Sequence, residues 1–182
     1  MNKVEQKLQF LQDTYSDQEY KIWWPSAAED YNANINNKKS CGAYRILAQI
    51  DRIISSIKEL RLPPGSKILD ICCGLPILPC RIKEEFPEFE VYGIDIYTHE
   101  YDEFSKYNKG CKIYKFPFQM LFEDSYKNNI DFELVTMFNS FRAFEGDVQE
   151  SILDWYKNNS KRFMSEDLRT KGIHIRTNKE KL

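Results

Sequence analysis

The stretch that decides the fold reads Ile68-Leu69-Asp70-Ile71-Cys72-Cys73-Gly74-Leu75-Pro76. Its first part is a short apolar run that predicts a buried strand, set off from the preceding segment by the turn signal Pro63-Pro64-Gly65. Its second part is a turn of small residues, and a helix is predicted after it, from Ile77 to Phe86, stopping at Pro87. A strand that ends in an acidic residue and such a turn brings backbone N–H groups and a helix N-terminus close to a ligand.

Strands and helices alternate through the rest of the chain. Further strands are predicted at residues 90–96, 112–116, 132–138 and 172–176, with helices near 101–107 and from Val148 to Phe163. This alternation implies right-handed crossovers and a mainly parallel sheet, with the ligand site at the carboxyl ends of the strands. The predicted fold class is therefore α/β, a Rossmann-like sheet of about five strands.

The residues before the first strand predict helices separated by a loop. A first amphipathic helix is indicated by Val4, Leu8, Leu11 and Tyr15, and a second runs from Gly42 to Leu60. The segment between them is polar in its second half, which favours an exposed loop there.

A second acidic residue ends the next predicted strand. Asp95 lies 25 residues after Asp70, and a carboxylate at this place can accept both hydroxyls of a ribose. A dinucleotide motif G-x-G-x-x-G would need glycine at Cys72, Gly74 and Ile77, and two of these three differ, which disfavours NAD and FAD. The chain has no G-x-x-x-x-G-K-[ST] motif, which excludes a P-loop NTPase.

These segments resemble the class I S-adenosylmethionine-dependent methyltransferases. Leu69 to Gly74 is similar to the first motif of that family, Val91 to Ile96 to its second motif, and Phe132 to Phe138 to its fourth-strand motif. The resemblance covers roughly residues 42–177. It implies a Rossmann-like methyltransferase domain over residues 42–182, preceded by a helical N-terminal extension, residues 1–41, that acts as a lid or an interface.

The resemblance also implies that S-adenosylmethionine is the cofactor. By position, Asp70 and the turn formed by Cys72, Cys73 and Gly74 would approach the amino-acid part of the cofactor. Asp95 would bind the ribose hydroxyls.

Other positions would surround the adenine and the methyl donor. The resemblance implies that Ile96 packs on adenine and that Phe118 and Gln119 border it. Phe138 and Asn139 would line the floor beside the methyl donor.

The sequence departs from the family pattern in three ways. A family glycine is Pro76 here, which has no N–H to offer a ligand. No acidic residue follows the third strand, where Gln119 could substitute. The resembled fold has about seven strands, so with five in place we expect residues 172–176 to form an exposed edge, or one covered by the N-terminal region or a second subunit, as in a homodimer.

Several residues allow a structural interpretation beside a functional one. Cys72 and Cys73 fit a role as small packing residues in the turn. His99 is typical of a surface residue and His174 of a structural one, so neither predicts a general base. Aromatic side chains precede the sheet, where they either pack against it or contact the substrate as part of a lid: Trp23, Trp24 and Tyr31.

Composition narrows the class of protein. The chain has 182 residues, enough for one domain, with 42% apolar and 30% charged residues, and no apolar run approaches the length of a membrane span. A net charge of −2 counts against a sequence-blind nucleic-acid binder. The five cysteines are odd in number and form no CxxC pair, so we expect no disulfide framework, no metal site and a reducing cytoplasmic setting.

We therefore expect methyl transfer to a small-molecule acceptor. Such a displacement depends mainly on positioning, which suits a sequence without an evident catalytic dyad. Two alternatives stay open. One is a catalytically inactive, methyltransferase-like binding or partner subunit, motivated by Pro76. The other is an RNA methyltransferase that uses the segment from Lys161 to Leu182, which carries a net charge of +4.

Overall fold

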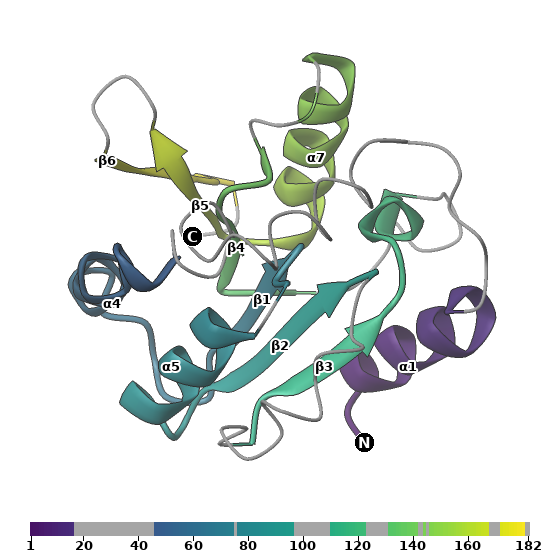
Figure 1. Ribbon diagram of the computed structural model, residues 1–182, viewed down its shortest axis with the longest axis horizontal. Coiled ribbons are helices and arrows are strands. Elements are labelled where there is room, and N and C mark those ends of the chain that lie inside the picture. Colours follow the sequence, from purple (N-terminus) through teal and green to yellow (C-terminus); the bar gives the residue numbers. More distant parts are fainter. Residues whose placement is uncertain are drawn as a thin grey trace, which may run out of the picture.

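The structure is a computed structural model that describes residues 1–16, 46–74, 76–96, 110–122, 131–141, 144, 146–167 and 172–180. In these residues six strands form one sheet in the order β3-β2-β1-β4-β5-β6 (Figure 1). The strands are β1 (Lys67–Ile71), β2 (Glu90–Asp95), β3 (Lys112–Lys115), β4 (Leu134–Met137), β5 (Arg162–Asp167) and β6 (Gly172–Thr177). The first five run parallel and β6 is antiparallel to β5, which confirms the predicted Rossmann-like α/β class.

Helices cover both faces of the sheet. They are α1 (Lys3–Tyr15), α4 (Ile50–Glu59), α5 (Ile77–Glu85), α7 (Gly146–Asn159) and the short 3-10 helix η2 (Phe118–Phe122). Helices α1 and α7 and the turn η2 pack on one face, and α4 and α5 on the other. Among the described residues, none of the helices combines the length and the apolar character needed to cross a membrane.

Alternation along β1 explains why both faces are apolar. Leu69 and Ile71 belong to the core shared with α1 and α7, whereas Ile68 belongs to the core shared with α4 and α5. Successive side chains of a strand point to opposite faces, so a strand buried on both sides is apolar throughout. Asp70 breaks this pattern and lies on the same face as Ile68.

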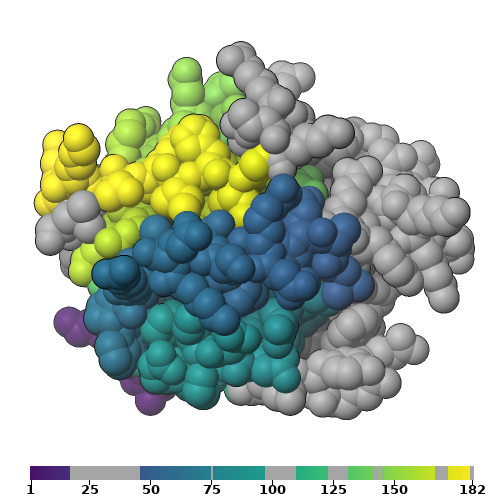
Figure 2. Space-filling view, turned by 90° about the vertical axis from the view of Figure 1, so that its left-hand side faces the viewer, coloured from purple at the N-terminus to yellow at the C-terminus, as the bar shows by residue number. Residues whose placement is uncertain are grey.

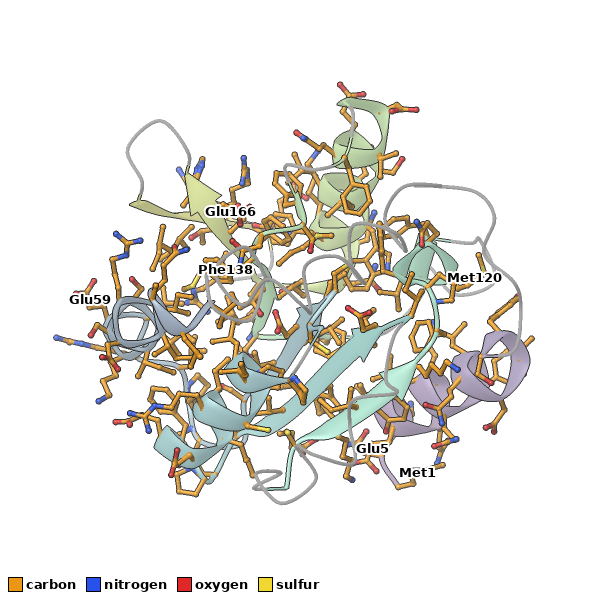
Figure 3. The ribbon with its side chains drawn as sticks, viewed as in Figure 1. Met1, Glu5, Glu59, Met120, Phe138 and Glu166 are labelled. Carbon is orange, nitrogen blue, oxygen red and sulfur yellow. The ribbon has the colours of Figure 1, made fainter. Side chains whose placement is uncertain are left out.

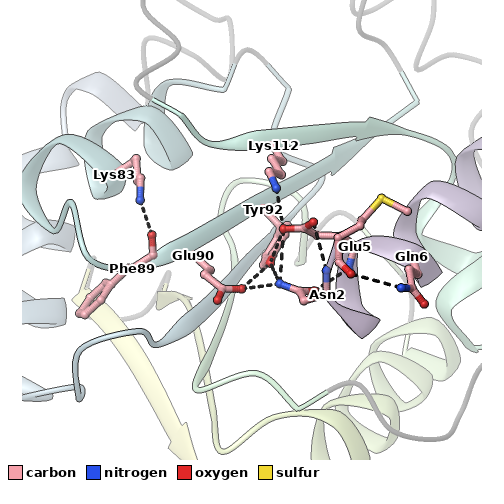
Figure 4. A network of polar contacts seen from close by, with 9 residues as sticks. Asn2, Glu5, Gln6, Lys83, Phe89, Glu90, Tyr92 and Lys112 are labelled. Atoms are coloured by element: carbon pink, nitrogen blue, oxygen red, sulfur yellow. Dashed lines mark hydrogen bonds and ion pairs between the residues drawn. The ribbon is translucent and has the colours of Figure 1, made fainter.

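The N-terminal helix α1 is tied to the start of β2 and β3 (Figure 4). Asn2 caps the helix and its Nδ2 donates to Glu90 Oε2 at 2.6 Å and to the Tyr92 hydroxyl at 2.9 Å. Lys112 Nζ lies 2.5 Å from Glu5 Oε1. These contacts fix α1 against the amino ends of two strands, as expected for a packed helix.

The two edges of the sheet differ. At the β3 edge, Gln12 of α1 accepts a hydrogen bond from the Lys115 backbone N–H at 2.7 Å. The described part of the N-terminal region therefore lies beside β3 and not over β6 (Figure 1). In Figure 2 the C-terminal strand lies against α4, and its Ile173 and Ile175 pack on the α4 and α5 core. In the described residues no strand pairs with the outer side of β6, so coverage by a second subunit stays a prediction.

The prediction of the last helix was wrong in its length. The helix ends at Asn159, and Phe163 belongs to β5, where it pairs with Val135 of β4. Phe163 follows Tyr156 by seven residues, which keeps it in phase with the helix and concealed the boundary. Within the described residues the sheet consequently has six strands where five were expected, and the segment predicted as the fifth strand is β6.

The other helices and strands differ less from their predicted bounds. The second predicted helix is regular from Ile50 to Glu59, and a turn at residues 48 and 49 precedes it. The predicted strand at 132–138 is β4 together with an isolated bridge between Phe132 and Ser160. The predicted helix near residues 101–107 lies outside the described residues.

Candidate functional site

The carboxyl ends of β1, β2, β4 and β5 lie side by side and carry the candidate site. Strand β1 is central, and its Asp70 is directly opposite Gly93 of β2 and Thr136 of β4. The chain leaves β1 for a neighbour on one side and reaches β4 on the other, which is the switch point where α/β sheets bind ligands.

The turn after β1 has an unusual backbone. Both Cys72 (φ 55°) and Gly74 (φ 53°) are in the left-handed region. Glycine adopts this conformation readily, whereas for cysteine it is uncommon and costs about 1–3 kcal/mol. A Cβ added at Gly74 would meet no atom within 4 Å, so in the described residues the space beside this turn is open. The backbone is held by the Cys73 N–H, which donates to the Ile94 carbonyl at 3.0 Å.

Gly93 gives this turn the room it occupies. A Cβ built at Gly93 would lie 2.9 Å from Cys73 Sγ and 2.7 Å from Ile113 Cδ1, both closer than such contacts allow. The requirement here is close approach and not a positive φ. The absence of a side chain at Gly93, in the second motif, therefore leaves room for Cys73 in the turn of the first motif.

Asp95 links the end of β2 to the same turn. Its Oδ2 accepts a hydrogen bond from the Gly74 N–H at 2.8 Å. A carboxylate has about four acceptor sites, and this hydrogen bond takes one of them. Ile96 follows directly and is half-buried.

Asp70 is a buried carboxyl group held by a hydroxyl. It is 4% exposed, and the Thr136 Oγ1 donates to Asp70 Oδ1 at 2.6 Å. Burial raises the pKa of Asp70 to about 7, the Thr136 hydrogen bond opposes this rise, and the charge of Asp95 adds to it. The site thus holds two acidic groups close together, which favours the binding of a positively charged group.

The two cysteines of the turn are thiols. Burial raises the pKa of both Cys72 and Cys73, and the charges of Asp95 and Asp70 raise it further. A thiol with a raised pKa is a poor nucleophile. This agrees with the interpretation of both as packing residues.

The segment after β4 forms the other side of the site. Phe138 is buried against the α4 and α5 core, and Asn139 follows with a φ of 60°. The Asn139 N–H donates to Glu166 Oε2 of β5 at 3.0 Å, and Figure 3 shows Glu166 beside Phe138 at this end of the sheet. Glu166 and Thr136 were not among the predicted site residues, because only strand pairing brings them to Asn139 and Asp70.

The two predicted adenine neighbours differ in their surroundings. Phe118 is buried in η2, with its ring 5.5 Å from Phe122 and 5.0 Å from Phe144. Gln119 is half-buried. Phe118 therefore packs into the core through η2, the segment that follows β3. Of the two, Gln119 has the more accessible side chain.

Some predicted residues cannot be placed. Trp23, Trp24, Tyr31 and His99 lie outside the described residues, so the lid stays a prediction. His174 is exposed on β6. In the part of the chain that the structure describes, no group of three His, Cys, Asp or Glu side chains could hold a metal ion.

Comparisons with known proteins find likeness in structure alone. No family model matches the sequence, and no curated protein matches it. Among solved structures, the plantazolicin methyltransferase BpumL, in complex with a triazolic desmethylPZN analogue and SAH, matches with a TM-score of 0.54 and 15% identity. That match covers 89% of this chain and 61% of that one.

Two further solved structures agree. The magnesium protoporphyrin IX methyltransferase ChlM from Synechocystis, with bound SAM, has a TM-score of 0.51 and 14% identity over 67% of this chain and 59% of that one. A TehB-like SAM-dependent methyltransferase from Corynebacterium glutamicum has a TM-score of 0.50 and 18% identity over 81% and 76%. This is the fold of the class I methyltransferases.

Within the methyltransferase fold, the candidate site lies where the sheet order reverses. At identities of 14–18% these matches show the fold and leave substrates open. The chain spans about three fifths of the length of the BpumL and ChlM structures. The methyltransferase fold agrees with the resemblance found in the motifs around Asp70 and Asp95.

Proposed function

We propose that this chain binds S-adenosylmethionine and transfers its methyl group to a small-molecule acceptor. The observation that carries the proposal is the pairing of the left-handed turn at Gly74 with Asp95. The Gly74 N–H and the Asp95 carboxylate are hydrogen-bonded at 2.8 Å, and the space beside Gly74 is open in the described residues. A carboxylate that could accept ribose hydroxyls therefore lies next to a turn that a ligand could approach.

The residues present fit the proposed cofactor. Asp95 would hold the ribose hydroxyls, and Ile96 would lie against the adenine. Asp70 and the turn from Cys72 to Gly74 would receive the amino-acid end, whose ammonium group favours the ionised form of the buried Asp70 carboxyl. When bound, S-adenosylmethionine supplies a methyl group on a positively charged sulfur.

The chain's own part in the reaction is positioning and exclusion of water. Phe138 and Asn139 would form the wall beside the donor, and the Asn139 backbone is held by Glu166. An in-line transfer needs donor and acceptor in a fixed geometry, and this requirement can supply much of the rate without a strong base. The loss of one N–H at Pro76 leaves the Cys73 and Gly74 amides to shape the turn.

A calorimetric titration tests the cofactor. We expect the reduced protein to bind S-adenosylmethionine and S-adenosylhomocysteine with one site per chain. No heat of binding at millimolar cofactor would contradict the proposal. Binding without turnover in every acceptor screen would favour the partner-subunit alternative.

A screen with radiolabelled S-adenosylmethionine tests the acceptor. We expect label in the low-molecular-weight fraction of a metabolite extract, carried by an organic acceptor. Label in a nuclease-sensitive fraction, with an affinity that falls steeply with salt, would instead support the RNA alternative. An Asp95→Ala enzyme serves as the control, because it should label neither fraction.

A further inference from the structure

Two cysteines from separate elements are in contact on the α5 face of the sheet. Cys80 is the fourth residue of α5, and Cys111 directly precedes β3. Their Sγ atoms lie 3.3 Å apart in a hydrogen bond, and both side chains are buried. They are 31 residues apart in the chain, so folding alone brings the thiols together.

Lys83 lies near the thiol pair and ties α5 to the segment that precedes β2. Lys83, one turn after Cys80, donates through Nζ to the Pro87 and Phe89 carbonyls at 2.7 and 2.6 Å. Its Cε lies 3.7 Å from the position that a Cβ on Gly110 would take. The Lys83 side chain therefore lies close to Gly110, the residue before Cys111.

Such a pair of thiols could bind a metal ion or form a disulfide. A zinc site needs three or four protein ligands, and the described residues contain no group of three that could supply them. Disulfide formation needs nothing beyond the two thiols and an oxidant. The bond is about 2.05 Å long, so the sulfurs would have to approach by about 1.2 Å, a movement of the size that side-chain rotation provides.

We propose that Cys80 and Cys111 form a reversible disulfide in the folded protein, with a small-molecule disulfide such as oxidised glutathione as the oxidant. One cysteine thiolate attacks a glutathione sulfur, which gives a mixed disulfide and releases one glutathione thiol. The second cysteine thiolate then attacks the cysteine sulfur of the mixed disulfide and releases the second glutathione thiol. In total the two cysteines lose two protons and two electrons, and one glutathione disulfide becomes two thiols.

Burial sets the rate of this reaction. The hydrogen bond with Cys80 raises the pKa of Cys111, and burial raises it further. The thiolate is therefore scarce in the closed structure, and oxidation proceeds through brief local opening. We expect a reaction over hours at neutral pH that becomes faster as the pH rises.

The bond would fasten α5 to the start of β3. It closes a loop that contains all of β2, including Asp95, and it restricts the unfolded chain. A loop of this length is expected to raise the melting temperature by about 5–10 °C. The inference does not depend on methyl transfer, since it uses no residue of the candidate site.

Peptide mapping tests the proposal on the native protein. Reduced protein is incubated with oxidised glutathione, blocked with N-ethylmaleimide and digested without reductant. We expect a cross-linked pair of peptides containing Cys80 and Cys111, a mass loss of two hydrogens, and a raised melting temperature that dithiothreitol reverses.

Other results have defined meanings. Recovery of both cysteines as maleimide adducts, or a bond from either one to Cys73, would overturn the proposal. Cys80→Ala and Cys111→Ala should each abolish the temperature rise, whereas Cys41→Ala should keep it. If the alanine variants fail to fold, the wild-type peptide map decides alone.

Discussion

Carboxylates lie at both ends of the parallel strands, and their surroundings are opposite. At the amino ends, Glu5 faces Lys112, whose hydrogen bond and charge lower the pKa of that carboxyl (Figure 4). At the carboxyl ends, Asp70 faces a hydroxyl and the charge of Asp95, and burial raises its pKa to about 7. Glu5 has its counter-charge in Lys112, whereas Asp70 is buried near Asp95, so a bound cation would favour its ionised form.

We infer that the two ends of the sheet have different roles: the carboxylate at the amino ends helps to attach α1, and those at the carboxyl ends bind a ligand. The ion pair between Glu5 and Lys112 stabilises the attachment of α1. Because Lys112 is exposed, its contribution to the free energy of unfolding is small. Two acidic groups held near each other cost stability, which is expected where a ligand brings a positive charge to them. Substitutions at the two ends of the sheet are therefore expected to have different effects.

The largest effect is expected at Asp95. Asp95→Ala should weaken S-adenosylmethionine binding at least about 30-fold, because two charge-assisted hydrogen bonds to ribose are lost. The matched control is Glu90→Gln at the opposite end of the same strand, where binding should be unchanged. Calorimetric titration of both variants measures this, and equal affinities in the two would remove Asp95 from the site.

The next effect is expected at Gly93. Gly93→Ala should lower the free energy of unfolding by about 1–3 kcal/mol and weaken cofactor binding, since the new Cβ would press on Cys73 Sγ and Ile113. Adding Cys73→Ala should recover part of both losses, as contacting positions are not additive. Gly146→Ala is the control, because a Cβ there meets no atom within 4 Å. Denaturant titration would contradict this account if Gly93→Ala and Gly146→Ala were equally stable.

The pH dependence of stability tests Asp70. Its pKa is about 7 in the folded chain against an ordinary 3.8, so the folded state binds the proton more tightly. The stability from this group is fully present below about pH 4 and is lost as the pH rises toward 7, by up to about 4 kcal/mol. Denaturant titrations at several pH values should show this decline in the wild type and not in Asp70→Asn.

Thr136 provides a matched pair of variants for the same group. Thr136→Val removes the hydroxyl that stabilises the ionised form, so the decline with pH should extend to higher pH. Thr136→Ser keeps a hydroxyl and should restore the wild-type profile. Identical profiles for the valine and serine variants would show that the 2.6 Å hydrogen bond does not tune Asp70.

The smallest effect is expected at the amino ends. Lys112→Met should lower the free energy of unfolding by no more than about 1 kcal/mol and leave cofactor binding unchanged. Because the pKa of Glu5 is lowered in the folded chain, the stability from this pair is present above the ordinary carboxyl pKa and lost as the pH falls below it. Thermal melts should therefore show a larger difference between variant and wild type at pH 7 than at pH 3.

The sequence predicted the centre of the sheet better than its far side. Strands β1 and β2 follow from largely apolar runs bounded by turns, and Asp70 and Asp95 stand near the ends of these runs. Strand β5 was missed because Phe163 continues the helical spacing of Tyr156, and only its pairing with Val135 distinguishes the two states. Periodicity along the chain carries no information about pairing across strands.

The same limit applies to the site. Gly74 could be predicted to need a positive φ, because the turn that follows β1 requires it. Thr136 and Glu166 could not be predicted, since their roles come from register and from a contact between β4 and β5. The left-handed Cys72 was also missed, because nothing about a cysteine in a sequence signals that conformation.

The most direct test of the central claim is a crystal structure of the chain with S-adenosylhomocysteine. We expect the ribose hydroxyls to lie within hydrogen-bonding distance of Asp95 and the amino-acid end to lie between Asp70 and the Gly74 turn. A ligand bound away from the carboxyl ends of β1 and β2, or bound there without contact to Asp95, would contradict it.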